Sequence, residues 1–392
     1  MPAAAPPGAA RPLRVFAAEP WYGGSHQRFL DDLARHSRHR FVPVTMAARY
    51  WKWRMQGGAV TLAEKLRAEA AAHGRPDVLF ASDMVHLPAL KALAPDVLAG
   101  VPTVLYFHEN QLTYPLREGQ ARDVTYAYIN YLSALVADRV VFNSHFHHDA
   151  FFEALPDLLR RFPDYTHVGT LPALRAKASV LHLGLDLAGL DAHAPPEPPP
   201  PGPPILLWNH RWEYDKDPEA FFRIVNRLDD AGLRFRLILA GQTFAEQPPA
   251  FAQGFRRYAE RVIHYGFAET FADYARLLHT ADLVVSTARH EFFGIAMMEA
   301  IYCGCHPLLP DRLTYPELIP ASLHRPLLHA PILYDSEDAL FEQLRRLLRG
   351  EDQPLPREVL RRIAEPLAWP AHAPRYDALF EELAQGASAG AS

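Results

Sequence analysis

Cysteine is almost absent from this chain of 392 residues, which contains only Cys303 and Cys305. These two residues are separated by one position and lie in an apolar stretch, so they indicate neither a disulfide framework nor a zinc site. No run approaches the ~20 apolar residues that span a bilayer. Residues 1–11 also lack the continuous apolar core of a secretory signal peptide. We therefore expect a cytoplasmic protein without a membrane anchor.

An excess of positive charge is absent as well. The formal net charge of -5 argues against a nucleic-acid binder that works through a global positive field, although it leaves room for a local basic patch. Hydrophobic residues make up 49% and charged residues 22%, which is typical of globular proteins. Because a single core stops growing at roughly 250 to 300 residues, we expect two domains of similar size.

Proline is concentrated in the segment 195–204, which reads Pro-Pro-Glu-Pro-Pro-Pro-Pro-Gly-Pro-Pro. Such a segment favours an extended polyproline conformation and predicts a linker. On both sides of it, short apolar runs alternate with helix-length segments, which is typical of parallel sheets covered by helices. The runs expected to form strands are 13–18, 41–45, 78–81, 103–107 and 140–143 before the linker, and 205–208, 236–240, 262–265 and 283–286 after it.

The alternation predicts an α/β protein with two doubly wound, Rossmann-like domains that face a central cleft. Ligands of such sheets bind beyond the carboxyl ends of the strands, so polar residues that follow strands are the candidates for function. The expected division is a disordered N-terminus (1–12), an N-terminal Rossmann-like domain (13–194), the linker (195–204), a C-terminal Rossmann-like domain (205–384) and a disordered tail (385–392).

Two segments of the first half follow expected strands. Gly23 and Gly24 let the backbone approach a phosphate or sugar at the start of a helix, although a plain strand-to-helix turn is an equally good interpretation. The other segment begins with His108, whose unperturbed pKa near 6.5 suits a proton carrier or a partner for a sugar hydroxyl. A structural histidine is the alternative, and the polar neighbours Glu109 and Asn110 favour function.

In the second half, Arg211 and Lys216 follow an expected strand. A guanidinium and an ammonium neutralise a diphosphate and stabilise a departing nucleoside diphosphate without a metal. The alternative is a solvated loop of mixed charge.

Glu291 and Glu299 stand eight residues apart. If a helix begins near Gly294, Glu299 lies inside it and Glu291 lies in the preceding loop. Glu299 would then accept both ribose hydroxyls, while Glu291 and the backbone around Phe293 and Gly294 hold the sugar or phosphate. Surface charge beside an apolar helix is the alternative. The small, apolar flanks of Glu299 favour burial, and a buried carboxylate needs a partner.

Together these segments resemble the retaining GT-B glycosyltransferases of the glycogen-synthase-like family 4. Longer strings look more specifically like the tRNA-queuosine mannosyltransferase family. These strings are Tyr-Gly-Gly-Ser-His at 22–26, Tyr-Phe-His-Glu-Asn-Gln-Leu at 106–112, His-Arg-Trp-Glu-Tyr-Asp-Lys-Asp-Pro-Glu at 210–219 and His-Glu-Phe-Phe-Gly at 290–294.

The resemblance implies transfer of mannose from GDP-mannose to queuosine in an aspartate tRNA, with retention at the anomeric carbon and without a metal or other cofactor. No protein nucleophile is implied. We expect catalytic roles for His108, Glu291, Arg211 and Lys216, and donor contacts also from Gly23, Gly24, Phe293, Gly294 and Glu299. Acceptor contacts are expected from His26, Glu109 and Asn110.

A tRNA acceptor also calls for a local basic patch. Trp51, Lys52, Trp53 and Arg54 interleave cations with rings, a combination that stacks on unpaired bases and holds phosphates. Alternatively, the tryptophans pack inward while the cations reach solvent. The basic stretch at Arg345, Arg346 and Arg349 is read as a solvated helix face.

Two other functions remain open. The same donor chemistry could serve a small-molecule, lipid or glycan acceptor. A protein that binds a nucleotide sugar or tRNA without catalysis is the second alternative. The sequence gives no sign of an obligate protein partner.

Overall fold

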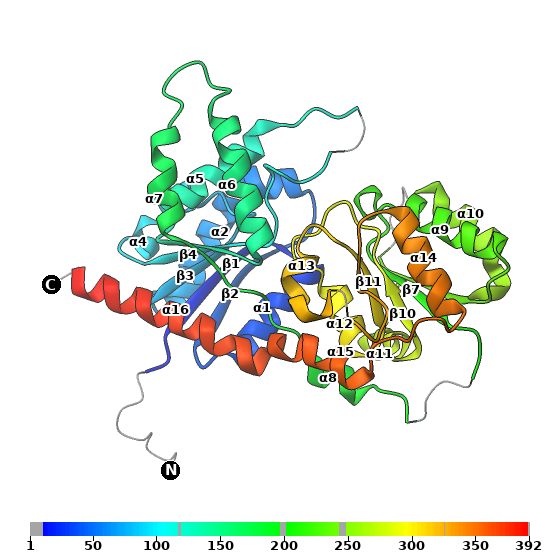
Figure 1. The fold of residues 1–392 in the computed structure, drawn as a ribbon. Coiled ribbons are helices and arrows are strands. Elements are labelled where there is room, and N and C mark those ends of the chain that lie inside the picture. The colour runs from blue at the N-terminus through cyan, green and yellow to red at the C-terminus, as the bar shows by residue number, and fades with distance from the viewer. Residues whose placement is uncertain (1–10, 117–118, 197–200, 243–247, 325, 391–392) are drawn as a thin grey trace, which may run out of the picture. The chain divides into compact units, whose positions relative to one another are not determined.

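The computed structural model describes residues 11–116, 119–196, 201–242, 248–324 and 326–390, with only the backbone described for 388–390. The chain divides into two compact units. Unit 1 comprises Met1–Tyr114, Ala121–Gly184 and Trp369–Ser392, and unit 2 comprises Pro115–Gln120 and Leu185–Ala368. In the described residues each unit contains one six-stranded sheet (Figure 1).

Unit 1 is built on a parallel sheet with the strand order β2-β1-β3-β4-β5-β6. Its strands are β1 (Arg14–Tyr22), β2 (Arg40–Ala47), β3 (Val78–Ser82), β4 (Thr103–Phe107), β5 (Arg139–Phe142) and β6 (Ala178–Val180). Its α-helices are α1 (Gly24–His36), α2 (Trp51–His73), α3 (Leu87–Leu93), α4 (Pro95–Leu98), α5 (Val124–Val136), α6 (His145–Leu159), α7 (Leu171–Ala176) and α16 (Trp369–Gly390).

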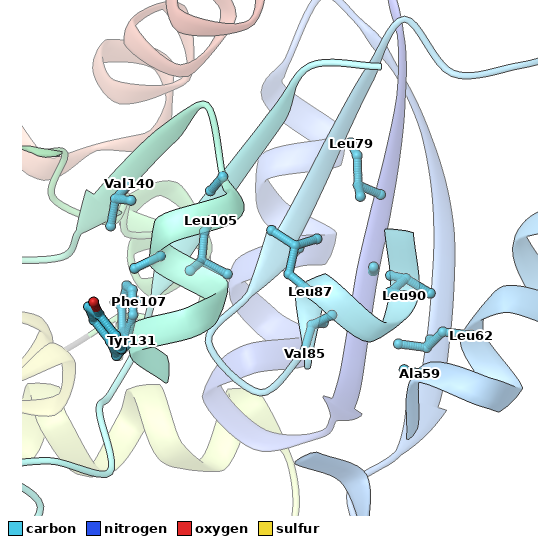
Figure 2. Packing of buried hydrophobic residues seen from close by; sticks show 14 of the residues in the cluster. Ala59, Leu62, Leu79, Val85, Leu87, Leu90, Leu105, Phe107, Tyr131 and Val140 are labelled. Carbon is cyan, nitrogen blue, oxygen red and sulfur yellow. The ribbon is translucent and has the colours of Figure 1, made fainter. Parts of the chain in front are cut away.

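Both faces of this sheet are covered, which explains why β3 and β4 are continuous apolar runs. On one face, alternate strand residues such as Leu79 and Leu105 pack with Leu62 of α2 and Leu90 of α3. Figure 2 shows these side chains together. On the other face, Phe29 of α1 stacks on Tyr106 with 4.7 Å between ring centroids. The buried sheet holds its carboxyl edge, where the polar loops begin, in a fixed place.

Unit 2 repeats the plan with the parallel strand order β12-β11-β10-β7-β8-β9. Its strands are β7 (Ile205–Asn209), β8 (Arg236–Ala240), β9 (Val262–Gly266), β10 (Leu283–Val285), β11 (His306–Pro310) and β12 (Leu333–Tyr334). Its helices are α8 (Leu187–Ala192), the 3-10 turn η2 (Tyr214–Lys216), α9 (Pro218–Asp230), α10 (Pro249–Tyr258), α11 (Phe271–Thr280), α12 (Ile295–Tyr302), α13 (Tyr315–Leu318), α14 (Glu337–Leu348) and α15 (Arg357–Ala364).

The expected α/β organisation with two parallel sheets is confirmed. Each run that was expected to be a strand overlaps one of these strands. The strands that were not expected are β6, β11 and β12. β11 reads His-Pro-Leu-Leu-Pro, and its prolines argue against a strand because they cannot donate to the ladder. β12 has only two residues, too few for a recognisable pattern.

The division of the chain differs from the expected one at both boundaries. Residues 185–194 belong to unit 2, because α8 packs there: Leu190 accepts a hydrogen bond from His279 and Asp191 pairs with Arg361 at 2.8 Å. The expected linker 195–204 falls partly outside the described residues, as does the expected disordered terminus 1–12.

The C-terminal helix α16 belongs to unit 1 rather than to the second domain (red in Figure 1). Asp377 accepts hydrogen bonds from the Ser37 hydroxyl and the Arg38 amide at the end of α1. Tyr376 and Phe380 are fully buried against the sheet. The helix also continues to Gly390, so the tail expected to be disordered from 385 is helical as far as it is described.

Among the described residues, no helix has both the length and the apolar character that crossing a membrane requires.

Candidate active site

Lys216 organises the polar loops at the carboxyl edge of the unit 2 sheet. It follows β7 and is only 6% exposed. Its ammonium donates to the backbone carbonyl of His290 across 2.6 Å and lies 3.3 Å from the carboxylate of Glu291. A second carboxylate, that of Asp215, lies 3.2 Å away. Lys216 therefore ties the loop after β7 to the loop after β10, the neighbouring strand in the sheet.

These ionic contacts set the protonation of the site. Burial would raise the pKa of Glu291, but the charge of Lys216 lowers it to about 2. Burial and the same ammonium lower the pKa of His210 to about 3 and the pKa of His290 to about 4. Near neutral pH the site thus holds an ionised carboxylate beside an ammonium, with two uncharged imidazoles.

Arg211 supplies a more accessible cation in the same loop. Its side chain is 47% exposed and lies 3.3 Å from the carboxylate of Glu213. The next residue, Trp212, is buried and stacks on Phe251 with 3.9 Å between centroids. This stacking anchors the loop while Arg211 remains accessible to an anion.

The helix α12 begins after Gly294, as expected from the sequence. Gly294 has a φ of 89°, a left-handed conformation that favours glycine. Phe293 is buried, and its amide donates to Glu291 across 3.5 Å. The loop thereby fixes Glu291 just before the first turn of the helix, where free backbone amides favour an anion.

Glu299 lies inside α12 and is 1% exposed, which confirms the expected burial. It accepts a hydrogen bond from the hydroxyl of Tyr274 in α11 across 2.7 Å. The side-chain amide of Asn209, at the end of β7, donates to the same hydroxyl across 2.9 Å. Glu299 is therefore held by a chain of polar groups that starts at the carboxyl end of β7.

In unit 1, the loop after β1 brings Glu19 against His26. One carboxylate oxygen of Glu19 accepts from the amide of Trp21 across 2.7 Å, and the other lies 3.1 Å from His26 Nδ1. The rings of His26 and His108 are 4.1 Å apart. The loop after β1 and the loop after β4 thus meet at the carboxyl edge of the sheet.

The charges of this cluster separate the two histidines. Burial would lower the pKa of His26, but the adjacent Glu19 carboxylate raises it to about 9. Burial and the charge of His26 lower the pKa of His108 well below its usual value. Burial also raises the pKa of Asp83, whose carboxylate accepts from the His108 amide across 2.9 Å. His26 is therefore charged and His108 uncharged near neutral pH.

The two glycines before α1 are required for different reasons. Gly24 has a φ of 55° in open space, so its backbone conformation favours glycine. Gly23 is extended, but a Cβ there would lie 2.7 Å from the Cβ of Ala48. Close packing of the loops after β1 and β2 explains Gly23.

The predicted acceptor residues next to His108 divide into two kinds. Asn110 is fully buried, donates to the Thr113 hydroxyl and accepts from the amides of Leu112 and Thr113. These bonds let Asn110 shape the loop after β4, and its expected contact with an acceptor stays a prediction. Glu109 is half-buried and accepts from the side-chain amide of Gln111.

The predicted basic and aromatic segment is the first turn of α2, where the structure separates its tryptophans. Trp51 is half-buried and packs on Tyr126 with 4.9 Å between centroids. Trp53 is 61% exposed. Lys52 is exposed, and Arg54 is half-buried and donates through Nε to the Ala47 carbonyl. Trp51 thus packs inward, as the alternative interpretation expects, whereas Trp53 keeps an exposed ring, and base stacking by it stays a prediction.

Glu19, His26 and His108 also satisfy the spacing of a metal site, since one ligand atom from each lies within 4.8 Å of the others. The Glu19 carboxylate already compensates the charge of His26, so the arrangement is complete as an ion pair.

Sequence reasoning did not single out Glu19, Asp83, Asp215 or Tyr274. Position supplies a signal for the first three, because each is at the end of a strand or in the loop that follows one. Tyr274 gives no such signal, since it lies inside α11 and reaches Glu299 only through tertiary packing.

Comparisons with known proteins agree with this geometry. Residues 14–185 match the family model described as tRNA-queuosine alpha-mannosyltransferase N-terminal, and residues 191–363 match Glycosyl transferases group 1. A tRNA-queuosine alpha-mannosyltransferase from Drosophila melanogaster is 32% identical over 342 residues, which cover 86% of this chain and 87% of that protein.

Solved structures of glycosyltransferases share the fold. Sucrose-phosphate synthase from Thermosynechococcus elongatus matches with a TM-score of 0.66 and 15% identity over 95% of this chain and 99% of that chain. HepE from Anabaena in complex with UDP matches with a TM-score of 0.63 and 16% identity over 94% and 98%. These likenesses confirm the two-domain, Rossmann-like GT-B fold.

Proposed function

Because the chain belongs to the tRNA-queuosine alpha-mannosyltransferase family, we propose that it transfers mannose from a nucleoside diphosphate sugar to the queuosine base of a tRNA. The proposal is supported mainly by the ion pair of Lys216 with Glu291. This pair lies in the half of the chain that matches the family Glycosyl transferases group 1. The loops after two adjacent strands thereby present a cation and an ionised carboxylate at one edge of the sheet.

The donor in this proposal is GDP-mannose, held by unit 2. Lys216 and the accessible Arg211 face the diphosphate, and their positive charge stabilises the leaving group as negative charge grows on it. The start of α12 adds the partial positive charge of a helix N-terminus. Because the pKa of Glu291 is held at about 2, its carboxylate is ionised and can accept hydrogen bonds from sugar hydroxyls. Glu299 accepts the ribose hydroxyls.

The acceptor is queuosine in tRNA, and its binding residues belong to unit 1. With a lowered pKa, His108 is uncharged near neutral pH, so it orients a sugar hydroxyl instead of protonating one. His26 keeps its charge beside Glu19 and holds the His108 ring from one side. We also propose that the transfer retains the anomeric configuration and needs neither a metal nor a protein nucleophile, and that the protein is cytoplasmic. These parts of the proposal rest on the family resemblance.

Sugar transfer from a panel of donors tests the proposal. The protein is incubated with radiolabelled GDP-mannose, UDP-glucose or ADP-glucose and with tRNA from cells that do or do not make queuosine. Label transferred from GDP-mannose to queuosine-containing tRNA alone, and unchanged by EDTA, is the expected result. Equal labelling of both tRNA preparations, or transfer to a lipid or glycan fraction instead, would overturn the acceptor. Loss of transfer in EDTA would overturn the metal-free mechanism.

A further inference from the structure

We propose that Tyr50 and Trp53, together with Arg49, Lys52 and Arg54, form a platform on which unpaired bases of an RNA loop stack. This inference rests on the proposed function, since it names the part of the tRNA substrate that unit 1 grips. The five residues span the turn before α2 and its first helical turn, and we call them the α2 platform.

The charge of the surrounding segment sets it apart from the rest of an acidic chain. Residues 33–63 contain no aspartate or glutamate, whereas the whole chain has a net charge of -5. The cations of the platform are Arg49, Lys52 and Arg54. In the part of the chain that the structure describes, Arg54 is bonded to a backbone carbonyl, and Lys52 lies 5.6 Å and 5.7 Å from the ring centroids of Trp51 and Tyr126. Lys52 also interacts electrostatically with the carboxylate of Asp123, so Arg49 and Arg54 supply most of the positive charge that is available for phosphates.

The two outer rings of the platform lie open to solvent. Tyr50 is 78% exposed and Trp53 is 61% exposed. A Cβ on Gly57 would meet the Trp53 ring at 2.8 Å, so this ring lies close to the helix backbone while most of it stays exposed. A flat, exposed aromatic face stacks on any base, because every base has a π-face.

Tyr50 also has an unfavourable backbone conformation, with a φ of 53°. The left-handed region costs a bulky residue free energy and persists where the surroundings enforce it. Here the conformation starts α2, since the Tyr50 carbonyl accepts from the Arg54 amide. The Tyr50 ring remains exposed in this conformation, three residues before Trp53.

The platform lies next to the candidate site. It follows β2, which pairs in parallel with β1, so it shares the carboxyl edge of the sheet with Gly23 after β1 and with His26 in the first turn of α1. The loop between β2 and the platform contacts the β1 loop directly, because a Cβ on Gly23 would lie 2.7 Å from the Cβ of Ala48. A base flanking the reacting nucleoside could therefore rest on the platform while that nucleoside approaches His108.

Another exposed tyrosine shows what is specific to this surface. Tyr165 is 83% exposed and has a φ of 44°, so it shares the exposure and the backbone conformation of Tyr50. Its neighbours in sequence include Asp157, which pairs with Arg160, and Asp164. The segment around Tyr165 thus carries both charge signs, unlike the segment around Tyr50. Tyr165 therefore serves as the matched control.

The test is binding of RNA by the full-length protein without any nucleotide sugar, followed by fluorescence anisotropy. The probes are a labelled anticodon stem-loop transcript without queuosine and a labelled RNA duplex of equal length. The double variant Tyr50→Ala/Trp53→Ala is expected to bind the stem-loop on the order of tenfold or more weakly. Tyr165→Ala is expected to bind it like the wild type. Replacing Arg49 by Gln should reduce the salt dependence of binding by about one phosphate contact.

Stem-loop binding by the double variant that matches the wild type, or an equal loss in Tyr165→Ala, overturns the proposal. An equal loss of duplex binding also overturns it, because unpaired bases would then not be what the rings recognise. If the wild type forms a dimer that the double variant abolishes while RNA affinity stays constant, the surface belongs to a second copy of the chain. If the double variant loses stem-loop binding and the wild type transfers no mannose, the platform is supported and the proposed function is refuted.

Discussion

The hydroxyl of Tyr274 donates a hydrogen bond to Glu299 across 2.7 Å and so joins α11 to α12. Asn209 donates to the same hydroxyl from the end of β7. These bonds restrict the carboxylate of Glu299, which lies buried inside its helix. An acceptor for ribose hydroxyls is effective only when it is held in position, and this network supplies that restraint.

Glu299→Ala is expected to weaken donor binding by about 10- to 100-fold, because hydrogen bonds to a charged group contribute about 1.5–3 kcal/mol. Tyr274→Phe should weaken it only about fivefold, since it removes the restraint and keeps the carboxylate. Isothermal titration with GDP-mannose measures both. The control is Tyr258→Phe, which loses a hydrogen bond to Asn226 on another helix pair of unit 2. Tighter binding by Tyr274→Phe than by the wild type would contradict the positioning role.

Lys216→Met is expected to cost about 3–5 kcal/mol of unfolding free energy, because it leaves the buried Asp215 without its ammonium partner. The double variant Asp215→Asn/Lys216→Met should recover part of that stability, since Asp215 then carries no charge, whereas the carboxylate of Glu291 still lacks its ammonium partner. It should not recover turnover, because the cation that faces the diphosphate is still missing. Urea unfolding and kcat measured on both variants separate the two roles. Recovery of kcat in the double variant would show that Lys216 is only structural.

The stability of unit 2 is expected to fall in mild acid. The folded pKa values of His210 and His290 are about 3 and about 4, below the ordinary 6.5 of an unfolded chain. The unfolded state therefore binds more protons as the pH drops below 6.5, at a cost of up to about 1.4 kcal/mol per pH unit for each histidine. The free energy of opening in unit 2, obtained from hydrogen exchange after correction for the intrinsic exchange rate at each pH, should fall between pH 7 and pH 5. A free energy of opening that stays constant over this range would contradict the burial of neutral imidazoles.

The ion pair of His26 and Glu19 predicts that the stability of unit 1 changes with pH in the opposite direction. The folded pKa of His26 is raised from 6.5 to about 9, so its stabilising contribution is fully present below pH 6.5 and is lost as the pH rises through 9. The difference in melting temperature between the wild type and His26→Asn should be largest near pH 6.5 and should shrink toward pH 9. A difference that is independent of pH would mean that His26 is uncharged.

Helix α16 is expected to stabilise unit 1 alone. Tyr376 is fully buried, with its ring 6.1 Å from Tyr106 and its hydroxyl bonded to the His182 carbonyl. Tyr376→Ala should therefore cost about 3–5 kcal/mol. Hydrogen exchange followed by peptide should show faster exchange in β3 and β4 and little change in β7 and β8. Faster exchange in unit 2 instead would contradict the assignment of α16.

The sequence predicted those features that depend on local patterns. Continuous apolar runs identified the central strands, because a parallel strand covered on both faces has no polar side. The positions of Glu291 and Glu299 around Gly294 followed from helical periodicity. The return of α16 to unit 1 did not, since it depends on contacts such as Asp377 with Ser37, far apart along the chain.

The same limit applies to the candidate site. Residue types and positions after strands singled out Lys216 and Glu291 separately, but they could not predict that the two side chains lie 3.3 Å apart. Composition could not tell Trp51 from Trp53, because which ring faces inward is decided by Tyr126, more than seventy positions away in the sequence. Nor could it show that Asn110 forms hydrogen bonds within its own loop.

Nucleoside mass spectrometry of treated tRNA tests the central claim most directly. The purified protein and its Glu291→Gln variant are incubated with GDP-mannose and queuosine-containing aspartate tRNA, which is then digested to nucleosides. We predict that queuosine gains the mass of one hexose with the wild type, that no other nucleoside changes, and that the gain is strongly reduced with the variant. Queuosine of unchanged mass, from a protein that binds GDP-mannose in the same sample, would contradict the account.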